Sequence, residues 1–190
     1  KKLKKKKRRR KSSSDNWNYG RISFSMAYFS TLMSDMGNLL SANDVLPSGI
    51  GVNVAYDQGL EYIHEHYMIP GIKIEHSYIY FTKDLFVNES KEVTGHAVYA
   101  GFMWAFPGLD SSWGCITLTG MPGATFMFVK NRESGDSDQT VTFSFKTTLG
   151  YEYQINVFAL QIHFNYNFII DKSVTFHGIG VSLGFAFKLW

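Results

Sequence analysis

The chain has 190 residues, a length that fits a single domain. Charged residues make up 18% of it and aromatic residues 16%, and 17 glycines stand against only 4 prolines. That balance favours strands and turns over helices. No stretch reaches the roughly 18 uncharged apolar residues that a membrane-spanning helix requires, so a helical membrane protein is excluded. The single cysteine, Cys115, cannot form an internal disulfide or a cysteine-based metal cluster.

The positive charge is concentrated at the N-terminus. The formal net charge is +3, yet residues 1–11 are basic at every position except Leu3, and the rest of the chain is acidic. Blocks of like charge repel one another and resist folding. We therefore expect residues 1–15 to form a disordered basic tail and residues 16–190 to form the folded domain. No apolar segment follows the basic run before Trp17, so this region lacks the pattern of a complete secretory signal peptide.

From Tyr19 onward, apolar side chains alternate with small or polar ones at a spacing of two residues. This spacing is typical of strands whose two faces meet different surroundings. It predicts eight strands, at residues 21–28, 50–57, 72–80, 97–106, 113–130, 141–152, 157–168 and 178–189. In the third of these strands, His76 falls on the otherwise apolar face.

Three stretches interrupt the regular pattern. Pro122 cannot donate a ladder hydrogen bond, so we expect a bulge or an interruption within the fifth strand. A tight turn near Tyr153 and Gln154 is expected between the sixth and seventh strands. Residues 58–69 place apolar side chains at helical spacing, so they are predicted as either a short amphipathic helix at the membrane surface or additional strand.

The composition of the two faces indicates which one points inward. One face is rich in Phe, Ile, Leu and Tyr, whereas the other carries Gly, Ala, Ser, Thr and Asn with a few charges. A soluble barrel with the apolar face inside would have an outer face unusually rich in Gly and Ala. In a narrow membrane barrel, small residues relieve crowding inside while lipid solvates the apolar face. We therefore predict an all-β fold, namely an eight-stranded antiparallel transmembrane up-and-down β-barrel.

The charges on the predicted inner face have both signs. Buried charges need partners, so we expect a lumen charge network of Arg21, Asp57, Lys73, Glu75, Lys146, Glu152 and Lys188. The alternative role of these residues is a selectivity lining for a narrow pore, although eight strands leave little free bore.

The order of long and short connections gives the barrel two different ends. Both termini share one end with most of the short turns, and longer polar connections lie at the other end. At the terminal end we expect an aromatic girdle at the membrane interface, formed by Trp17, Tyr19, Phe106, Trp113, Tyr151 and Trp190.

The last strand, residues 176–190, alternates apolar side chains and ends on an aromatic residue. In this it resembles the terminal strand of small bacterial outer-membrane β-barrel proteins of the OmpA/OmpX type. The resemblance covers residues 17–190 as an architecture. It implies an outer membrane of the Gram-negative type, with the termini in the periplasm and the long loops outside. It also implies that the barrel-assembly machinery reads a C-terminal signal formed by Phe185, Phe187 and Trp190.

Two histidine motifs suggest chemistry but do not support a site. His64 and His66, with His76 farther on, have no clear third and fourth ligand, so no metal or cofactor is predicted. His76 and Ser77 invite comparison with outer-membrane lipid A deacylases, which use a His and a Ser in a small barrel. Adjacent residues of a strand point to opposite faces, however, and cannot act as a direct base and nucleophile pair. We therefore predict no catalytic residues.

The function expected from the sequence is that of a non-enzymatic outer-membrane protein with a structural or surface-interaction role. A narrow passive channel is the alternative, and a soluble lipid-carrying barrel is the third option. The expected partners are membrane lipid, lipopolysaccharide, the barrel-assembly machinery and a protein contacted by the outer loops. The tail Lys1–Lys11 would suit an anionic periplasmic partner. Nucleic acid is not expected, because the tail lacks interleaved aromatic residues.

Overall fold

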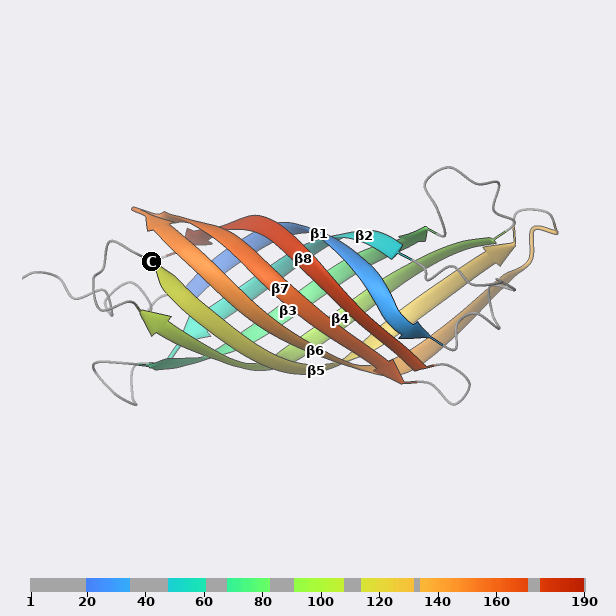
Figure 1. Ribbon diagram of the computed structural model, residues 1–190, viewed down its shortest axis with the longest axis horizontal. Helices are drawn as coiled ribbons and strands as arrows, with labels where there is room; N and C mark the ends of the chain where they lie inside the picture. Colours follow the sequence, from blue (N-terminus) through green and yellow to red (C-terminus); the bar gives the residue numbers. More distant parts are fainter. Residues whose placement is uncertain are drawn as a thin grey trace, which may run out of the picture.

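A computed structural model describes residues 20–34, 48–60, 68–82, 91–107, 114–131, 134–170 and 175–189. These residues contain eight strands: β1 (Gly20–Ser34), β2 (Ser48–Gly59), β3 (Ile69–Thr82), β4 (Lys91–Pro107), β5 (Cys115–Asn131), β6 (Ser137–Ile155), β7 (Phe158–Ile170) and β8 (Thr175–Lys188). Consecutive strands pair antiparallel and β8 pairs with β1, so the sheet closes into a barrel of tilted strands (Figure 1). The predicted eight-stranded up-and-down architecture is confirmed. No helix in the described ranges is long and apolar enough to cross a membrane.

The two faces of the sheet are arranged as the composition predicted. On β8, Leu183 points outward and is 60% exposed, whereas the preceding Ser182 points into the barrel and is 2% exposed. On β1, Met26 is 73% exposed on the outside, whereas Arg21 and Ser23 are buried inside. Apolar side chains therefore cover the exterior, whereas most of the buried charged and polar side chains point into the interior.

Glycines on neighbouring strands make room for the largest inward side chains. Tyr99 on β4 lies opposite Gly123 on β5, where a Cβ atom would come within 2.6 Å of the Tyr99 ring. Phe29 on β1 lies opposite both Gly49 on β2 and Gly180 on β8. A Cβ at Gly180 would come within 2.7 Å of the Phe29 Cβ. A narrow barrel thus accommodates aromatic rings inside because the neighbouring strands carry glycine directly opposite them.

The prediction at Pro122 is a bulge or an interruption, and the structure shows the interruption: the β4–β5 ladder contains no pair for Ala100, Gly101, Met121 or Pro122. β5 runs through Pro122 without an inserted residue, and the β4–β5 register is the same on both sides, with Tyr99 opposite Gly123 and Phe102 opposite Gly120. The side chain of Pro122 lies on the outer face. The register irregularity that the structure does contain lies between β1 and β8, at residues 31–33.

The turn between β6 and β7 lies farther along the chain than predicted. Ile155 pairs with Phe158, and Asn156 and Val157 form the two-residue connection. Asn156 has a φ of 56°, a left-handed conformation that asparagine tolerates better than most residues. The strand outlasts the expected turn because Tyr153 and Ile155 continue the outward apolar phase.

Both termini of the barrel wall lie at one end (Figure 1). The Leu189 amide donates a hydrogen bond of 2.9 Å to the Gly20 carbonyl, which joins the start of β1 to the end of β8. We call this the terminal end and the opposite one the loop end. The basic tail and residues 61–67 lie outside the described residues. Next to residues 61–67, the Leu60 amide donates a hydrogen bond of 2.7 Å to the Pro70 carbonyl, so the pairing of β2 with β3 reaches residue 60.

Candidate functional site: the barrel lumen

A first group of charges lies inside the terminal half of the barrel, centred on Arg21 of β1. The Arg21 Nε donates to Asp57 Oδ2 at 2.7 Å, and Nη2 forms an ion pair with the same oxygen. The Arg21 Nη1 donates to Glu152 Oε2 at 2.7 Å. Asp57 lies on the adjacent strand β2, whereas Glu152 comes from β6. Arg21 therefore ties its own wall of the barrel to a wall three strands away.

A second group is centred on Glu75 of β3. Lys146 of β6 forms an ion pair with Glu75 Oε1, and Lys73 Nζ lies 3.4 Å from Glu75 Oε2. The Ser77 hydroxyl donates to Glu75 Oε1 at 3.0 Å. One carboxylate is thus paired with two lysines, one on its own strand and one across the lumen.

The two groups together balance in charge. Three cations, Arg21, Lys73 and Lys146, face three carboxylates, and the side chains of all six are nearly inaccessible to solvent. Further polar contact comes from β7, where Gln161 Nε2 donates to Glu152 Oε1 at 2.9 Å and His163 Nε2 lies 3.8 Å from the same oxygen. Because ions of opposite sign alternate around the lumen, no ring of a single sign is present among these six residues.

The structure thus brings together six of the seven residues expected to form the lumen charge network. Lys188, the seventh, is half-buried at the terminal end, opposite Arg21 in the β1–β8 ladder. Gln161 and His163 extend the group on the β7 wall.

The loop half of the lumen is filled by apolar side chains instead. We call this cluster the apolar plug; it consists of Phe29, Ile79, Phe81, Val93, Met127 and Ile169. The rings of Phe29 and Phe81 meet edge to face, with centroids 5.5 Å apart. Sequence reasoning missed most of the plug because the predicted strands ended too early, at Tyr28 and Tyr80. The signal for the apolar plug in the sequence is a strand end at which consecutive residues, and not only alternate ones, are apolar, as at Ile169 and Ile170.

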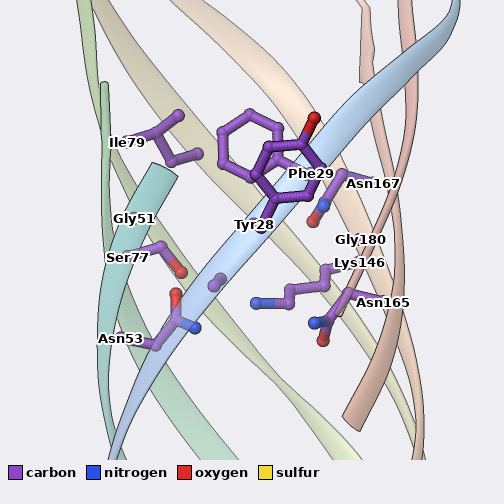
Figure 2. Close-up of a pocket in the computed structure, with 11 residues that line it drawn as sticks. Tyr28, Phe29, Gly51, Asn53, Ser77, Ile79, Lys146, Asn165, Asn167 and Gly180 are labelled. Atoms are coloured by element: carbon purple, nitrogen blue, oxygen red, sulfur yellow. The ribbon is translucent and has the colours of Figure 1, made fainter. Parts of the chain in front are cut away.

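A small cavity separates the apolar plug from the ion pairs (Figure 2). Lys146 reaches towards it from one wall, Asn53 and Ser77 from the opposite wall, and the Phe29 ring closes one side. Its volume is about 10 Å³, enough for about one water molecule. The lumen around Lys146 is therefore packed rather than open.

The outer wall offers more space than this inner cavity. A hollow of about 560 Å³ lies over β6, β7 and β8, bordered by Leu149, Phe164, Tyr166 and Val181. These side chains belong to the outward phase of their strands. A hydrocarbon chain would fit this hollow in size and polarity, which is consistent with an exterior solvated by lipid.

Two members of the predicted aromatic girdle can be placed. Phe106 and Tyr151 are exposed on the outside near the terminal end, and both lie opposite Ile116 of β5. The other four, Trp17, Tyr19, Trp113 and Trp190, lie outside the described residues. In the predicted assembly signal, Phe185 is exposed and Phe187 half-buried, with ring centroids 5.3 Å apart; Trp190 also lies outside the described residues.

The barrel wall separates the side chains of His76 and Ser77. His76 is exposed on the outside, whereas Ser77 is buried inside against Glu75, so the two side chains point to opposite faces as expected. His64 and His66 lie outside the described residues. Within the described residues, no group of three or more His, Cys, Asp or Glu side chains is arranged to hold a metal ion.

Comparison with known proteins supports the fold and goes no further. No family model matches the chain, and no curated protein sequence matches it. Among solved structures, the chain is similar to Neisserial surface protein A, with a TM-score of 0.69 and 12% identity over 90% of this chain and 97% of that one. It is also similar to the outer membrane protein OprG from Pseudomonas aeruginosa, with a TM-score of 0.54 and 10% identity over 92% and 98%. For Ail, the attachment invasion locus protein of Yersinia pestis, the TM-score is 0.51 and the identity 16% over 89% and 99%. The chain has the fold of these small outer-membrane β-barrels.

Proposed function

We propose that the protein is a closed, non-conducting barrel of the bacterial outer membrane with a structural or surface-interaction role. The observation that carries this proposal is the filled lumen. Ion pairs cross the terminal half and the apolar plug fills the loop half, with a cavity of only about 10 Å³ between them. Solutes have no path through such an interior. Other molecules would therefore bind at the ends of the barrel or on its outer wall.

The exterior supports a membrane location. Outward side chains such as Phe102 and Leu183 are more than half exposed, and such a continuous apolar surface would aggregate in water. This argues against a soluble lipid-carrying barrel, in which the apolar face would point inward. Two of the similar structures are named as a surface protein and as an attachment protein, and a surface role for this chain agrees with those names.

The orientation and partners follow from the same proposal. The terminal end would face the periplasm, where the tail Lys1–Lys11 could meet an anionic partner, and the loop end would face outward. The wall would contact membrane lipid and lipopolysaccharide. During assembly, the outer face of β8, with Phe185 and Phe187, would be presented to the barrel-assembly machinery.

Conductance across a planar bilayer tests the closed lumen. Reconstituted protein, first shown to be folded by its shifted mobility on an unheated SDS gel, is expected to give no sustained current. A passive channel would instead give stable single-channel steps. Steps whose ion selectivity changes in Lys146→Gln would contradict the closed barrel and establish the channel.

Insertion into lipid tests the membrane location separately. Leu183→Arg places a cation near the middle of the apolar exterior and is expected to disfavour insertion by about 2–4 kcal/mol. Ser137→Arg is the matched control, because Ser137 is exposed at the loop-end start of β6. The readout is the folded fraction after mixing with lipid vesicles. Equal folding of both variants, or a wild-type protein that stays soluble and monomeric without detergent, would refute the membrane assignment.

A further inference from the structure

Two histidines meet on the outer wall of the barrel, on adjacent strands. His76 of β3 and His96 of β4 are diagonal neighbours in the ladder, since His76 lies opposite Val98 and His96 opposite Tyr78. The His76 Nε2 and the His96 Nδ1 are 3.3 Å apart. Both side chains are exposed. The lumen and its ion pairs make no use of this pair.

The two nitrogens form a hydrogen bond in this structure, and their separation also matches that of two nitrogens bound to one zinc ion. Zinc binds imidazole nitrogens at about 2.0–2.1 Å with tetrahedral geometry, which places two such nitrogens about 3.3 Å apart. The ring centroids are 5.5 Å apart and the ring planes are inclined by 33°. When the donor ring of this hydrogen bond moves its proton to its other nitrogen, both rings direct a lone pair to a common metal ion with little movement of either strand.

The polar residues nearest the histidine pair lie on its loop-end side. On β4, the outward residues change from Glu92, Thr94 and His96 to an apolar series that begins at Val98. His96 thus borders polar residues on its own strand, and water can approach it from the side of Thr94. His76 lies between Ile74 and Tyr78 on β3 and opposite Val98 on β4, on the apolar side of the pair. The rings of Tyr78 and Phe128 flank His96, with centroids 5.0 Å and 6.2 Å away, and restrict its motion. A histidine that is held in place and is reached by water on one side suits a metal ion whose remaining ligands are water molecules.

We propose that His76 and His96 form a two-histidine site for a divalent transition-metal ion, such as Zn²⁺ or Cu²⁺, on the loop-end border of the barrel exterior. The site differs from the motif that the sequence suggested, because it joins His76 to His96, whereas His64 and His66 lie outside the described residues. It would bridge β3 and β4 and does not depend on the role proposed for the lumen.

Electron paramagnetic resonance with Cu²⁺ tests this site, because the spectrum reports the number of coordinating nitrogens. The starting protein is the full chain with His64→Gln and His66→Gln, which removes the competing histidines. We expect one Cu²⁺ per folded barrel with two nitrogen ligands. In this background, His76→Gln or His96→Gln should weaken binding by at least an order of magnitude and remove the two-nitrogen signal.

His177→Gln in the same background is the matched control. His177 also lies on the outer wall, where its Nδ1 is 2.7 Å from the Tyr166 hydroxyl, and its loss should leave Cu²⁺ binding unchanged. Shifted mobility on an unheated gel verifies that each variant is folded. The proposal is overturned if the starting protein shows no two-nitrogen Cu²⁺ signal, or if that signal survives the loss of His96.

Discussion

The crossing ion pairs and the apolar plug of the lumen lie in different halves of the barrel. In the terminal half, Arg21 and Glu75 each bind two groups of opposite charge, on their own side of the barrel and across it. In the loop half, Phe29, Ile79 and their neighbours pack without any charge. Both halves exclude solute, but by different means. The ion pairs need particular partners at particular distances, whereas the apolar plug needs only enough volume.

This difference has a consequence for tolerance to substitution. Removing one member of a buried ion pair leaves its partner charged and desolvated, which costs more than the pair itself contributes. Removing part of an apolar side chain costs the lost burial and the cavity that remains. The terminal half should therefore be sensitive to single changes of charge, and the loop half to changes of volume and shape.

The largest effect is expected for Glu75→Ala in the terminal half. Lys73 and Lys146 then lose their shared carboxylate, and the free energy of unfolding should fall by about 3–5 kcal/mol. Urea unfolding in lipid, followed by tryptophan fluorescence, measures it. The control is the triple variant Lys73→Met, Glu75→Leu and Lys146→Met, which removes all three charges and should be more stable than Glu75→Ala. A triple variant less stable than the single one would show that the charges are not what makes this half sensitive.

Phe29→Ala tests the loop half with an expected loss of about 3 kcal/mol, the low end for a buried Phe→Ala change. The loss stays low because the new void joins the cavity beside Asn53 and Lys146, which lets water enter a partly polar space. The same unfolding assay measures it. A loss larger than that of Glu75→Ala would reverse the order of the two halves.

Gly49→Ala tests whether shape limits the apolar plug. The added methyl would collide with the Phe29 ring and come within 2.9 Å of the Tyr80 carbonyl, so a loss of about 1–3 kcal/mol is expected. Gly120→Ala is the matched control, because the nearest atom to its added methyl, in the Phe145 ring, is 3.8 Å away. In a Phe29→Ala background the Gly49→Ala loss should shrink, and strict additivity of the two changes would refute the proposed contact.

Met127→Leu should have the smallest effect, because it conserves volume within the apolar plug. The expected loss is below about 1.5 kcal/mol. Lys146→Met is its counterpart in the terminal half, since it keeps the length of the side chain but withdraws the cation that pairs with Glu75 across the lumen. Unfolding midpoints in urea should rank Met127→Leu above Lys146→Met. Equal midpoints would mean that both halves tolerate substitution alike.

The alternation of side chains determined the fold from the sequence alone. A strand has a period of two, so each residue's face can be read locally. Arg21, Asp57, Lys73, Glu75, Lys146 and Glu152 were therefore assignable to the lumen without a structure. The boundaries were harder to place, because Tyr153, Ile155 and Phe29 continue the strands without a glycine or proline to mark where they end.

Only the tertiary structure decided which residues meet. The pairing of Glu75 with Lys146, 71 positions apart, depends on closure of the sheet and on the stagger of its strands, which no local pattern encodes. The same closure brings β1, β3, β4, β5 and β7 together in the apolar plug. It also places His76 beside His96, 20 positions farther along the chain. A period of two assigns a residue to a face of the sheet, whereas its neighbours on that face are set by the register of all eight strands.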